Sequence, residues 1–475
     1  DNDKKIRHRE EKIIDFFNSN LSNFNFGEVP TPTPTPTIVP SWVPPSDPYI
    51  KVPMSKVKKQ FNQWFVEFGE KQAKQMVLKW LNGELNEPPV PENIIKAIDY
   101  PDGIYICFSN GMGIAYDTNI EENIDRYIDL FPKKTPTPNQ KKFNEVEKQK
   151  LQKQDRVNTF RSTHILVLAP IEFHHYEQYF IKNYIKSFQW DIVNYLTSQG
   201  YSIDAIRTAN STIRINFPTW DPNNVTLGYK DGNIYLKLIN DDLSFNVTDP
   251  NNLVRPSNFL KNMKDYGIIF ITTHTGSSPF GEGILCCPTD IVDKDITDWM
   301  KENKEYHCSY NSDGTFNPKG FWFISTFEYF VYDENLIKSY TYNAIFLLPK
   351  AFGNQDFRDS LVYLDSCKSW DLGISINQGV KTHLGYNNRV TLKDATEKSY
   401  EFFSKLTGIN QNTTRPDPNI KPMSVGDAYN SLTNNPITND PQHAKLLLYP
   451  DPTQLLETYF PAPMSITVEK KRGEL

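Results

Sequence analysis

One histidine and one cysteine of this 475-residue chain each follow a short apolar run, and together they could carry nucleophilic chemistry. The first run leads into Thr272–Gly276, which contains His274, and the second leads into Asp365–Cys367. A thiolate is a strong nucleophile, and a neighbouring imidazole can generate it and later protonate the leaving amine. The small residues Gly276 and Ser366 leave room for a substrate backbone and for N–H groups that stabilise an oxyanion. The pair therefore indicates acyl transfer through a thioester, if the fold brings the two side chains together.

Six short, continuous apolar runs predict strands that are buried on both faces of a parallel sheet. They are His164–Ala169, Tyr201–Ile206, Tyr266–Thr272, Ser360–Leu364, Val380–Leu384 and Ala444–Tyr449. Helical patterns lie between them at Tyr176–Ser198, Glu397–Leu406 and Ser424–Leu432. This alternation predicts an α/β domain whose sheet carries helices on both faces. Ligands bind such sheets at the carboxyl ends of the strands, which is where His274 and Cys367 fall.

The two motifs resemble the signature of the caspase-like cysteine peptidases, in which one apolar strand ends in His-Gly and a later one ends in Ala/Ser-Cys. The matching segments are Ile268–Gly276 and Leu361–Cys367, and the resemblance covers about residues 160–450. This superfamily includes caspases, legumain, gingipains, clostripain, separase and the bacterial CHAT domains. The resemblance implies a three-layer αβα sandwich with a mostly parallel sheet.

The resemblance also implies roles for single residues. His274 would be the general base and acid, and Cys367 the nucleophile. Backbone N–H groups near Gly276 and of Cys367 would form the oxyanion hole. These peptidases work as a His-Cys dyad without an obligatory third acid, so Asp365 is expected to be structural. Calcium occurs in several relatives and is raised here by the resemblance alone, while the residues themselves predict no cofactor and no metal site.

One departure from the family pattern bears on activity. The family has Gly directly after the His, whereas this chain has Thr275 and only then Gly276. A β-branched side chain there would narrow the oxyanion region or rotate its donor. The alternative to a peptidase is therefore a catalytically weak or inactive domain of the same fold, serving recognition or scaffolding at a cell surface. A small-molecule enzyme on a flavodoxin-like sheet is disfavoured, because no phosphate-binding loop follows the first strand.

The residues near the two motifs give a weak indication of substrate. Three pocket candidates are Glu282 and Asp371, in loops after the catalytic strands, and His383 in the fifth strand. The acidic surplus of the chain mildly favours a basic residue on the N-terminal side of the scissile bond. Residues 133–160 are rich in Lys, and an exposed linker of this kind would be a site of self-cleavage that releases the catalytic domain.

Composition excludes several other classes of protein. A net charge of −6 and a pI of about 5.9 give no basic footprint for nucleic acid. The partner that the family resemblance implies is a protein or peptide substrate. No apolar run is long enough for a transmembrane helix. Five cysteines cannot form a disulfide framework in so long a chain, and the absence of CxxC argues against a zinc knuckle. The sequence gives no indication of an oligomeric state.

The chain is expected to divide into five parts. Residues 1–50 contain a Thr-Pro-rich spacer, 51–132 a small helix-and-hairpin module resembling a prodomain, 133–160 the basic linker, 161–460 the caspase-like domain and 461–475 a tail. In the module, apolar periodicity predicts a helix over Ser55–Leu81, and an Asn-Gly turn predicts a hairpin of 103–108 and 114–116. The Pro-rich spacer favours an extracellular or envelope-associated protein, with a cytoplasmic one as the alternative.

Overall fold

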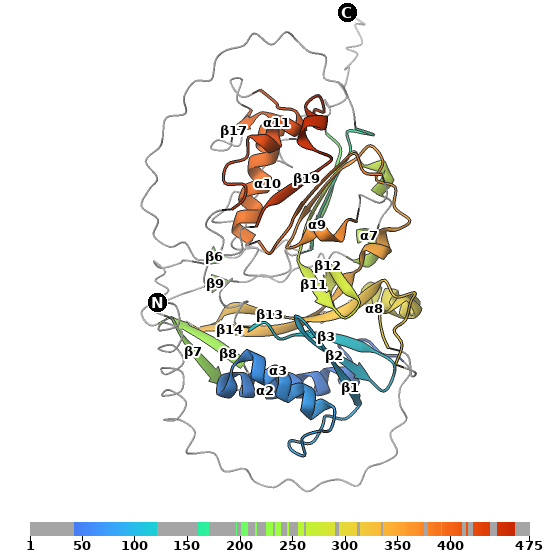
Figure 1. Cartoon of the computed structure of the whole chain (residues 1–475), viewed down its shortest axis with the longest axis vertical. Helices are drawn as coiled ribbons and strands as arrows, with labels where there is room; N and C mark the ends of the chain where they lie inside the picture. The colour runs from blue at the N-terminus through green and yellow to red at the C-terminus, as the bar shows by residue number, and fades with distance from the viewer. Residues whose placement is uncertain are drawn as a thin grey trace, which may run out of the picture. The chain divides into compact units, whose positions relative to one another are not determined.

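The protein, seen here in a computed structural model, falls into two compact units (Figure 1). Unit 1 consists of Asp1–Asp125, Asp221–Leu243 and Thr289–Asn343, and unit 2 of Arg126–Trp220, Ser244–Pro288 and Ala344–Leu475. The structure describes residues 42–120, 160–170, 196, 201–207, 214–215, 225–230, 233–238, 245–246, 255–260, 263–289, 294–310, 314–333, 336–374, 379–390, 392–410, 415–416, 421–437 and 444–460. The Thr-Pro spacer, most of the basic linker and the C-terminal tail therefore lie outside the described residues.

The predicted domain boundaries differ from these units. Segments 221–243 and 289–343, which lie inside the predicted domain 161–460, group with the N-terminal module. The physical reason is strand pairing, because β13 (Trp322–Asp333) runs parallel to β3 (Gly113–Asp117) and hydrogen-bonds to it. The sequence could not disclose a pairing between strands about 200 residues apart.

The predicted helix of unit 1 is two helices. The helices are α2 (Pro48–Phe68) and α3 (Glu70–Leu81), separated by Gly69. Gly69 has a φ of 79°, a left-handed conformation that glycine adopts readily, and its N–H ends α2 by bonding to the Phe65 carbonyl. The apolar faces of both helices are buried, so the predicted amphipathicity is confirmed although the single helix is not.

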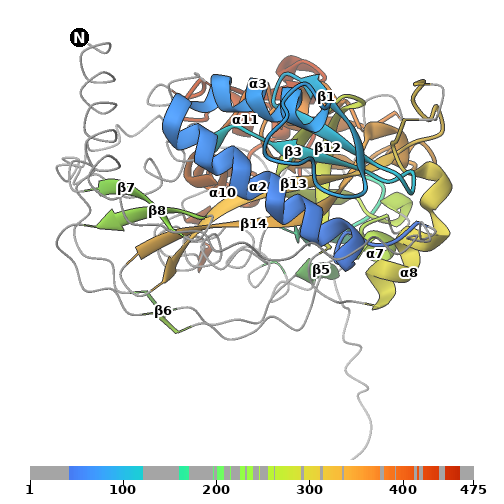
Figure 2. The ribbon, with the colours of Figure 1, turned by 90° about the horizontal axis from the view of Figure 1, so that it is seen from below.

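The sheet of unit 1 contains the predicted hairpin. Strands β2 (Gly103–Phe108) and β3 are antiparallel, and β1 (Ile94–Tyr100), which the sequence analysis missed, pairs with β2. Helix α3 packs against β1 and β2, while α2 lies beside β8 (Figure 2). The remaining strands of the unit are β7 (Val225–Lys230), β8 (Asn233–Leu238) and most of β14 (Leu336–Leu347), and its last helix is α8 (Lys294–Glu302).

Unit 2 is built on a six-stranded sheet with the order β19-β16-β15-β10-β4-β5. Its strands are β4 (Ile165–Ala169), β5 (Ile203–Arg207), β10 (Ile268–Thr272), β15 (Leu361–Asp365), β16 (Thr382–Tyr386) and β19 (Leu446–Tyr449). All six predicted strands are present. Five are mutually parallel, and only the edge strand β19 runs antiparallel to its neighbour.

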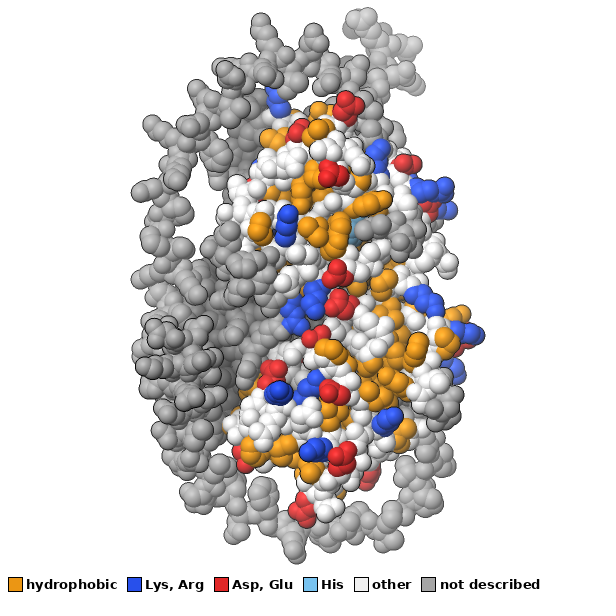
Figure 3. All heavy atoms as spheres, in the orientation of Figure 1, with side chains coloured by type: hydrophobic (Ala, Val, Ile, Leu, Met, Phe, Trp, Pro, Cys, Tyr) orange, Lys and Arg blue, Asp and Glu red, His pale blue; other side chains and the backbone are white. Residues whose placement is uncertain are grey.

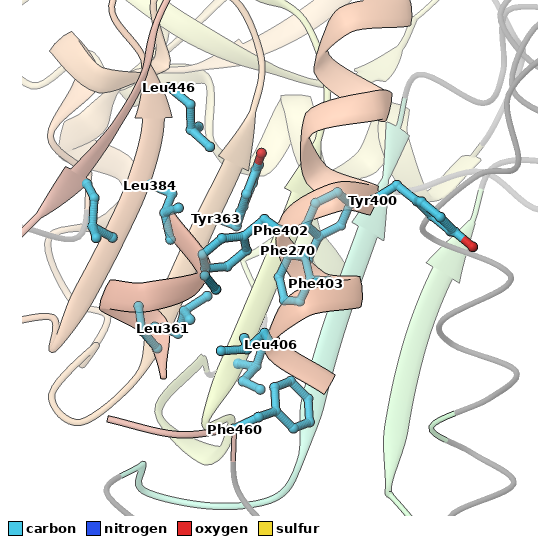
Figure 4. Packing of buried hydrophobic residues seen from close by; sticks show 14 of the residues in the cluster. Phe270, Leu361, Tyr363, Leu384, Tyr400, Phe402, Phe403, Leu406, Leu446 and Phe460 are labelled. Atoms are coloured by element: carbon cyan, nitrogen blue, oxygen red, sulfur yellow. The ribbon is translucent and has the colours of Figure 1, made fainter. Parts of the chain in front are cut away.

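Two predicted helices cover this sheet, α10 (Leu392–Thr407) and α11 (Val425–Asn430). Aromatic rings from α10 pack on the central strands (Figure 4): the Phe403 centroid lies 5.8 Å from that of Phe270 on β10 and 5.6 Å from that of Tyr363 on β15. Burying a large side chain contributes about 1.5–3 kcal/mol, so this cluster fixes the two strands that lead into the predicted site. The third predicted helix, Tyr176–Ser198, falls almost wholly outside the described residues.

A hairpin on unit 2 was not predicted. Strands β11 (Thr275–Ser278) and β12 (Gly281–Pro288) are antiparallel, and β12 continues the pairing onto Ala344–Leu347 of β14. Gly281 makes the turn with a φ of 117°, where a side chain would be strained. The hairpin begins one residue after His274, so it belongs to the architecture of the predicted site.

Shorter elements complete the described parts. They are α7 (Pro256–Phe259), α9 (Ser369–Leu372), the pair β6 (Arg214–Ile215) and β9 (Phe245–Asn246), and the pair β17 (Ile409–Asn410) and β18 (Arg415–Pro416). Within the described parts, no helix has the length and apolar character needed to span a bilayer. On the face seen in Figure 3, Lys and Arg side chains are interspersed with Asp and Glu rather than gathered in a stripe.

Candidate active site

The two chemistry-bearing residues follow neighbouring strands. Strands β10 and β15 are parallel and hydrogen-bonded, in a register that places Ile268 opposite Leu361 and Thr272 opposite Asp365. Every residue of both strands is buried, which explains their continuous apolar sequence. His274 stands two residues beyond Thr272, and Cys367 two residues beyond Asp365. The prediction that these strands are adjacent and end at the same edge of the sheet is confirmed.

Hydrogen bonds hold the backbone around His274 from two sides. The Thr273 N–H donates to the Asp365 carbonyl over 3.1 Å, which extends the pairing of β10 with β15 by one step. The Thr273 hydroxyl donates to the Leu285 carbonyl over 2.7 Å, and the Leu285 N–H donates to the His274 carbonyl over 2.8 Å. The half-buried His274 is therefore fixed between the sheet and strand β12.

The residue after His274 contacts the residue before Cys367. The Thr275 hydroxyl donates to the Ser366 hydroxyl over 3.1 Å. Gly276 follows in β11, where an added Cβ would come within 2.6 Å of the Phe346 ring, so packing requires glycine at this position. The predicted use of the Gly276 region for an oxyanion hole remains a prediction, but the close packing of Gly276 against Phe346 of β14 is clear.

The Cys367 thiol lies against the loop that follows β16. Its Sγ accepts from the Val390 N–H and donates to the Val390 carbonyl, both over 3.4 Å. The next residue, Lys368, adopts a left-handed conformation with a φ of 49°, and its N–H donates to the Asn388 carbonyl over 3.0 Å. All five cysteines are free, and Cys367 is the only one that is not buried. It is therefore the accessible thiol of this protein.

The pocket candidates Glu282 and Asp371 differ in their surroundings. Glu282, on β12, forms an ion pair with Lys368, with 3.2 Å between Oε1 and Nζ. Its charge is thus matched by a residue of the chain itself, and a basic substrate residue would have to compete for it. Asp371 is exposed in the first turn of α9.

The third candidate, His383, does not lie at the surface. It is fully buried in β16, and its ring centroid is 5.6 Å from that of Trp370. Burial lowers its pKa to about 4, so the ring is neutral at pH 7. The expected contact with substrate is therefore corrected, because His383 packs inside the sheet.

Asp365 is the residue whose importance the sequence analysis missed. Its side chain is 3% exposed, and among the described residues no group makes a hydrogen bond of good geometry to either carboxyl oxygen, although the Thr272 hydroxyl lies near. Burial raises its pKa to about 7, with a smaller opposing effect of the neighbouring Thr272 hydroxyl. Buried acids are nearly always paired, so an unpaired one two residues before the thiol is a candidate for a functional role. The signal for Asp365 that the sequence offered was a carboxylate at the end of an otherwise apolar strand.

The described side chains form no site for a metal ion. Within the described ranges, no three His, Cys, Asp or Glu residues come together as coordination would require. The calcium raised by family resemblance therefore has no cluster of carboxylate ligands among the described residues.

Comparisons with protein-family models, with curated proteins and with solved structures found no match to this chain.

Proposed function

We propose that the chain is a cysteine endopeptidase of the caspase-like type, with His274 as general base and acid and Cys367 as nucleophile. One observation carries the proposal: β10 and β15 are parallel neighbours, and each reactive residue stands two positions beyond a directly paired residue, Thr272 or Asp365. The six-stranded sheet, with one antiparallel edge strand and α10 across one face, agrees with the three-layer architecture that the resemblance implies.

The proposed reaction has two steps. His274 takes the proton of Cys367, and Sγ attacks the carbonyl carbon of the scissile peptide bond. Backbone N–H groups, including that of Cys367, stabilise the oxyanion, and protonated His274 gives its proton to the leaving amine. Water, deprotonated by His274, then attacks the thioester, which releases the new carboxyl end and returns the proton to the thiol. Before attack, Sγ must leave the Val390 carbonyl to which it is hydrogen-bonded.

A basic residue before the scissile bond fits the exposed carboxylate of Asp371 best. Asp365 is only 3% exposed, so its carboxyl is closed to a substrate side chain in the same way as His383. Glu282 is less suited, because Lys368 already neutralises it. Residues 133–160 offer Lys side chains in the same chain, so self-cleavage of a zymogen there forms part of the proposal.

Hydrolysis of fluorogenic peptides that differ only before the scissile bond tests this function. We expect turnover of Lys and Arg substrates by the wild type and none by Cys367→Ala. Mass spectrometry of the same two proteins after incubation tests self-cleavage, since only the wild type should be cut in the linker. No hydrolysis of any peptide, or equal cutting of both proteins, would contradict the proposal.

The second candidate function is an inactive recognition or scaffold domain, of an extracellular or envelope-associated protein. Two contacts favour it: the Cys367 thiol is bonded to Val390, and a Thr275 side chain stands where the family has glycine. A protein that folds, exposes a single reactive thiol and hydrolyses no peptide would support this alternative.

A further inference from the structure

We propose that the β11–β12 hairpin is a positioning clamp, which sets the separation of His274 and Cys367 by gripping the residues on both sides of the cysteine. The inference rests on the proposed function, because it assigns positioning residues to the same reaction. Two contacts carry it, the Thr275–Ser366 hydrogen bond and the Glu282–Lys368 ion pair. Neither had a place in the mechanism expected from the sequence.

The first contact joins the immediate neighbours of the two reactive residues. Thr275 follows His274 and begins β11, and its hydroxyl donates to Ser366, which precedes Cys367. Ser366 is 3% exposed, so water competes little for this bond. The bond therefore couples the two strand ends beyond the last backbone pairing of β10 with β15.

The second contact holds the other side of the cysteine. Glu282 lies on β12, opposite Ser277 of β11, and its carboxylate meets the Lys368 ammonium at 3.2 Å. Lys368 has the left-handed backbone conformation that non-glycine residues seldom adopt, and the ion pair helps to keep it there. Cys367 is thus flanked on both sides by residues tied to one hairpin.

The hairpin can act as a clamp because it is itself fixed. The Leu285 N–H bonds to the His274 carbonyl, and the Thr273 hydroxyl bonds to the Leu285 carbonyl. At Gly276 the packing against Phe346 leaves no room for even a Cβ atom. A shift of the hairpin would therefore move His274 as well, and a displacement of about 1 Å at a reacting pair can lower a rate by on the order of 100-fold.

This role also accounts for Thr275, which stands where the family pattern has glycine. A hydroxyl bonded to Ser366 is directed at the cysteine turn, so the side chain joins the two halves of the site. On this account the hydroxyl is what matters, and the extra bulk of a β-branched residue is secondary.

Three variants of the first contact test the clamp. Thr275→Val keeps the shape and removes the hydroxyl, Ser366→Ala removes its acceptor, and Thr275→Ser restores the hydroxyl without the methyl group. We expect kcat to fall at least about 10-fold in the first two with little change in KM, and Thr275→Ser to stay near the wild type. The double variant Thr275→Val/Ser366→Ala should be no worse than either single one. Equal kcat in Thr275→Val and Thr275→Ser would overturn the clamp.

The ion pair is tested in parallel with a matched control. Glu282→Gln should lower kcat several-fold, whereas Lys294→Met, which removes the exposed Lys294–Asp298 pair of α8, should leave it unchanged. Equal effects of the two changes would count against the clamp. Thermal unfolding of every variant shows whether a lower kcat comes from displacement of His274 and Cys367 or from failure to fold.

A second measurement keeps the clamp distinct from the peptidase proposal. The rate of Cys367 alkylation by iodoacetamide needs no peptide substrate, and the other four cysteines are buried. We expect slower alkylation in Thr275→Val and recovery in Thr275→Ser, because a misplaced His274 generates the thiolate less well. If no peptide is hydrolysed but alkylation follows this pattern, the clamp stands and the peptidase fails. If peptides are hydrolysed and alkylation is the same in all variants, the clamp fails alone.

Discussion

A histidine and a cysteine occur together in each unit of this protein, in very different settings. In unit 1, His307 and Cys308 are adjacent in sequence and both 1% exposed, and the His307 ring lies 4.6 Å from that of Trp322. In unit 2, His274 and Cys367 are far apart in sequence, stand at the ends of paired strands and are half-buried. Residue type is the same in both places. Exposure and strand topology separate the structural pair of unit 1 from the pair that we propose to be reactive.

Burial explains why the pair in unit 1 is unsuited to proton transfer. It lowers the pKa of His307 to about 3, with a smaller opposing effect of the Gly113 backbone, so the ring cannot hold a proton at neutral pH. Cys308 has no access to a substrate. The pair in unit 2 differs in access, since both of its side chains are partly exposed, and hydrogen bonds of Thr273 and Thr275 fix the turns that carry them.

The largest expected effect comes from comparing two single variants, in which Cys367 or Cys308 is replaced by alanine. Cys367→Ala should lower peptide hydrolysis by on the order of 10⁴-fold or more, because it removes the nucleophile. Cys308→Ala, in the other unit, should leave kcat and KM unchanged once folding is verified. Steady-state kinetics on a lysyl substrate measures both. A loss of activity in Cys308→Ala with Cys367→Ala still active would reverse the comparison.

The next effect concerns Asp365 and the stability of unit 2. Its pKa is raised from 3.8 to about 7, so the fold favours the neutral acid, and stability is lost as the pH rises from about 4 through 7. The difference between the two pKa values corresponds to about 4 kcal/mol of the free energy of unfolding. Asp365→Asn should therefore resist urea better than the wild type at pH 8 and equally well at pH 4.

Asp365→Asn should also separate stability from function. Because the Asp365 carboxyl is only 3% exposed, the variant should gain stability and keep its preference for Lys and Arg. A variant that is less stable at pH 8 would show that the carboxylate is paired, and one that loses the preference would show that the carboxylate contacts substrate.

The smallest effect is the acid response of unit 1, which has the opposite sign. The pKa of His307 falls from 6.5 to about 3 on burial, so its contribution is intact above pH 6.5 and declines as the pH falls toward 3. At pH 5 the loss amounts to about 2 kcal/mol of the free energy of unfolding. His307→Phe should therefore be less sensitive to a change from pH 7 to pH 5 in urea unfolding followed by tryptophan fluorescence. Equal sensitivity of both proteins would show that another group causes the acid response.

The central sheet could be predicted from the sequence because its strands are buried on both faces. Continuous apolar runs such as Ile268–Ile271 and Leu361–Leu364 predict buried strands, and the candidate catalytic residues follow from the ends of those strands. The β11–β12 hairpin could not be predicted, since a segment such as Thr275–Ser278 has no apolar period and forms a strand only by pairing with β12. Gly69 likewise ended a helix that apolar periodicity alone would have continued.

The site was harder to predict than the fold, because its decisive features are pairings of side chains. Glu282 was a reasonable pocket acid until the structure placed Lys368 against it. His383 was a candidate by its position in the fifth strand, but burial excludes it. Asp365 is expected from the sequence to be structural, and only the structure discloses that its carboxyl is buried without a close hydrogen-bond partner among the described residues. Sequence spacing carries no information on such contacts between distant residues.

The most direct test of the paired site is to map the adduct of a lysyl peptidyl acyloxymethyl ketone by mass spectrometry. We expect one adduct on the wild type, located on Cys367, and a large loss of labelling rate in His274→Ala, while Cys308→Ala labels like the wild type. Labelling of another cysteine, or labelling of Cys367 at an unchanged rate in His274→Ala, would contradict the account.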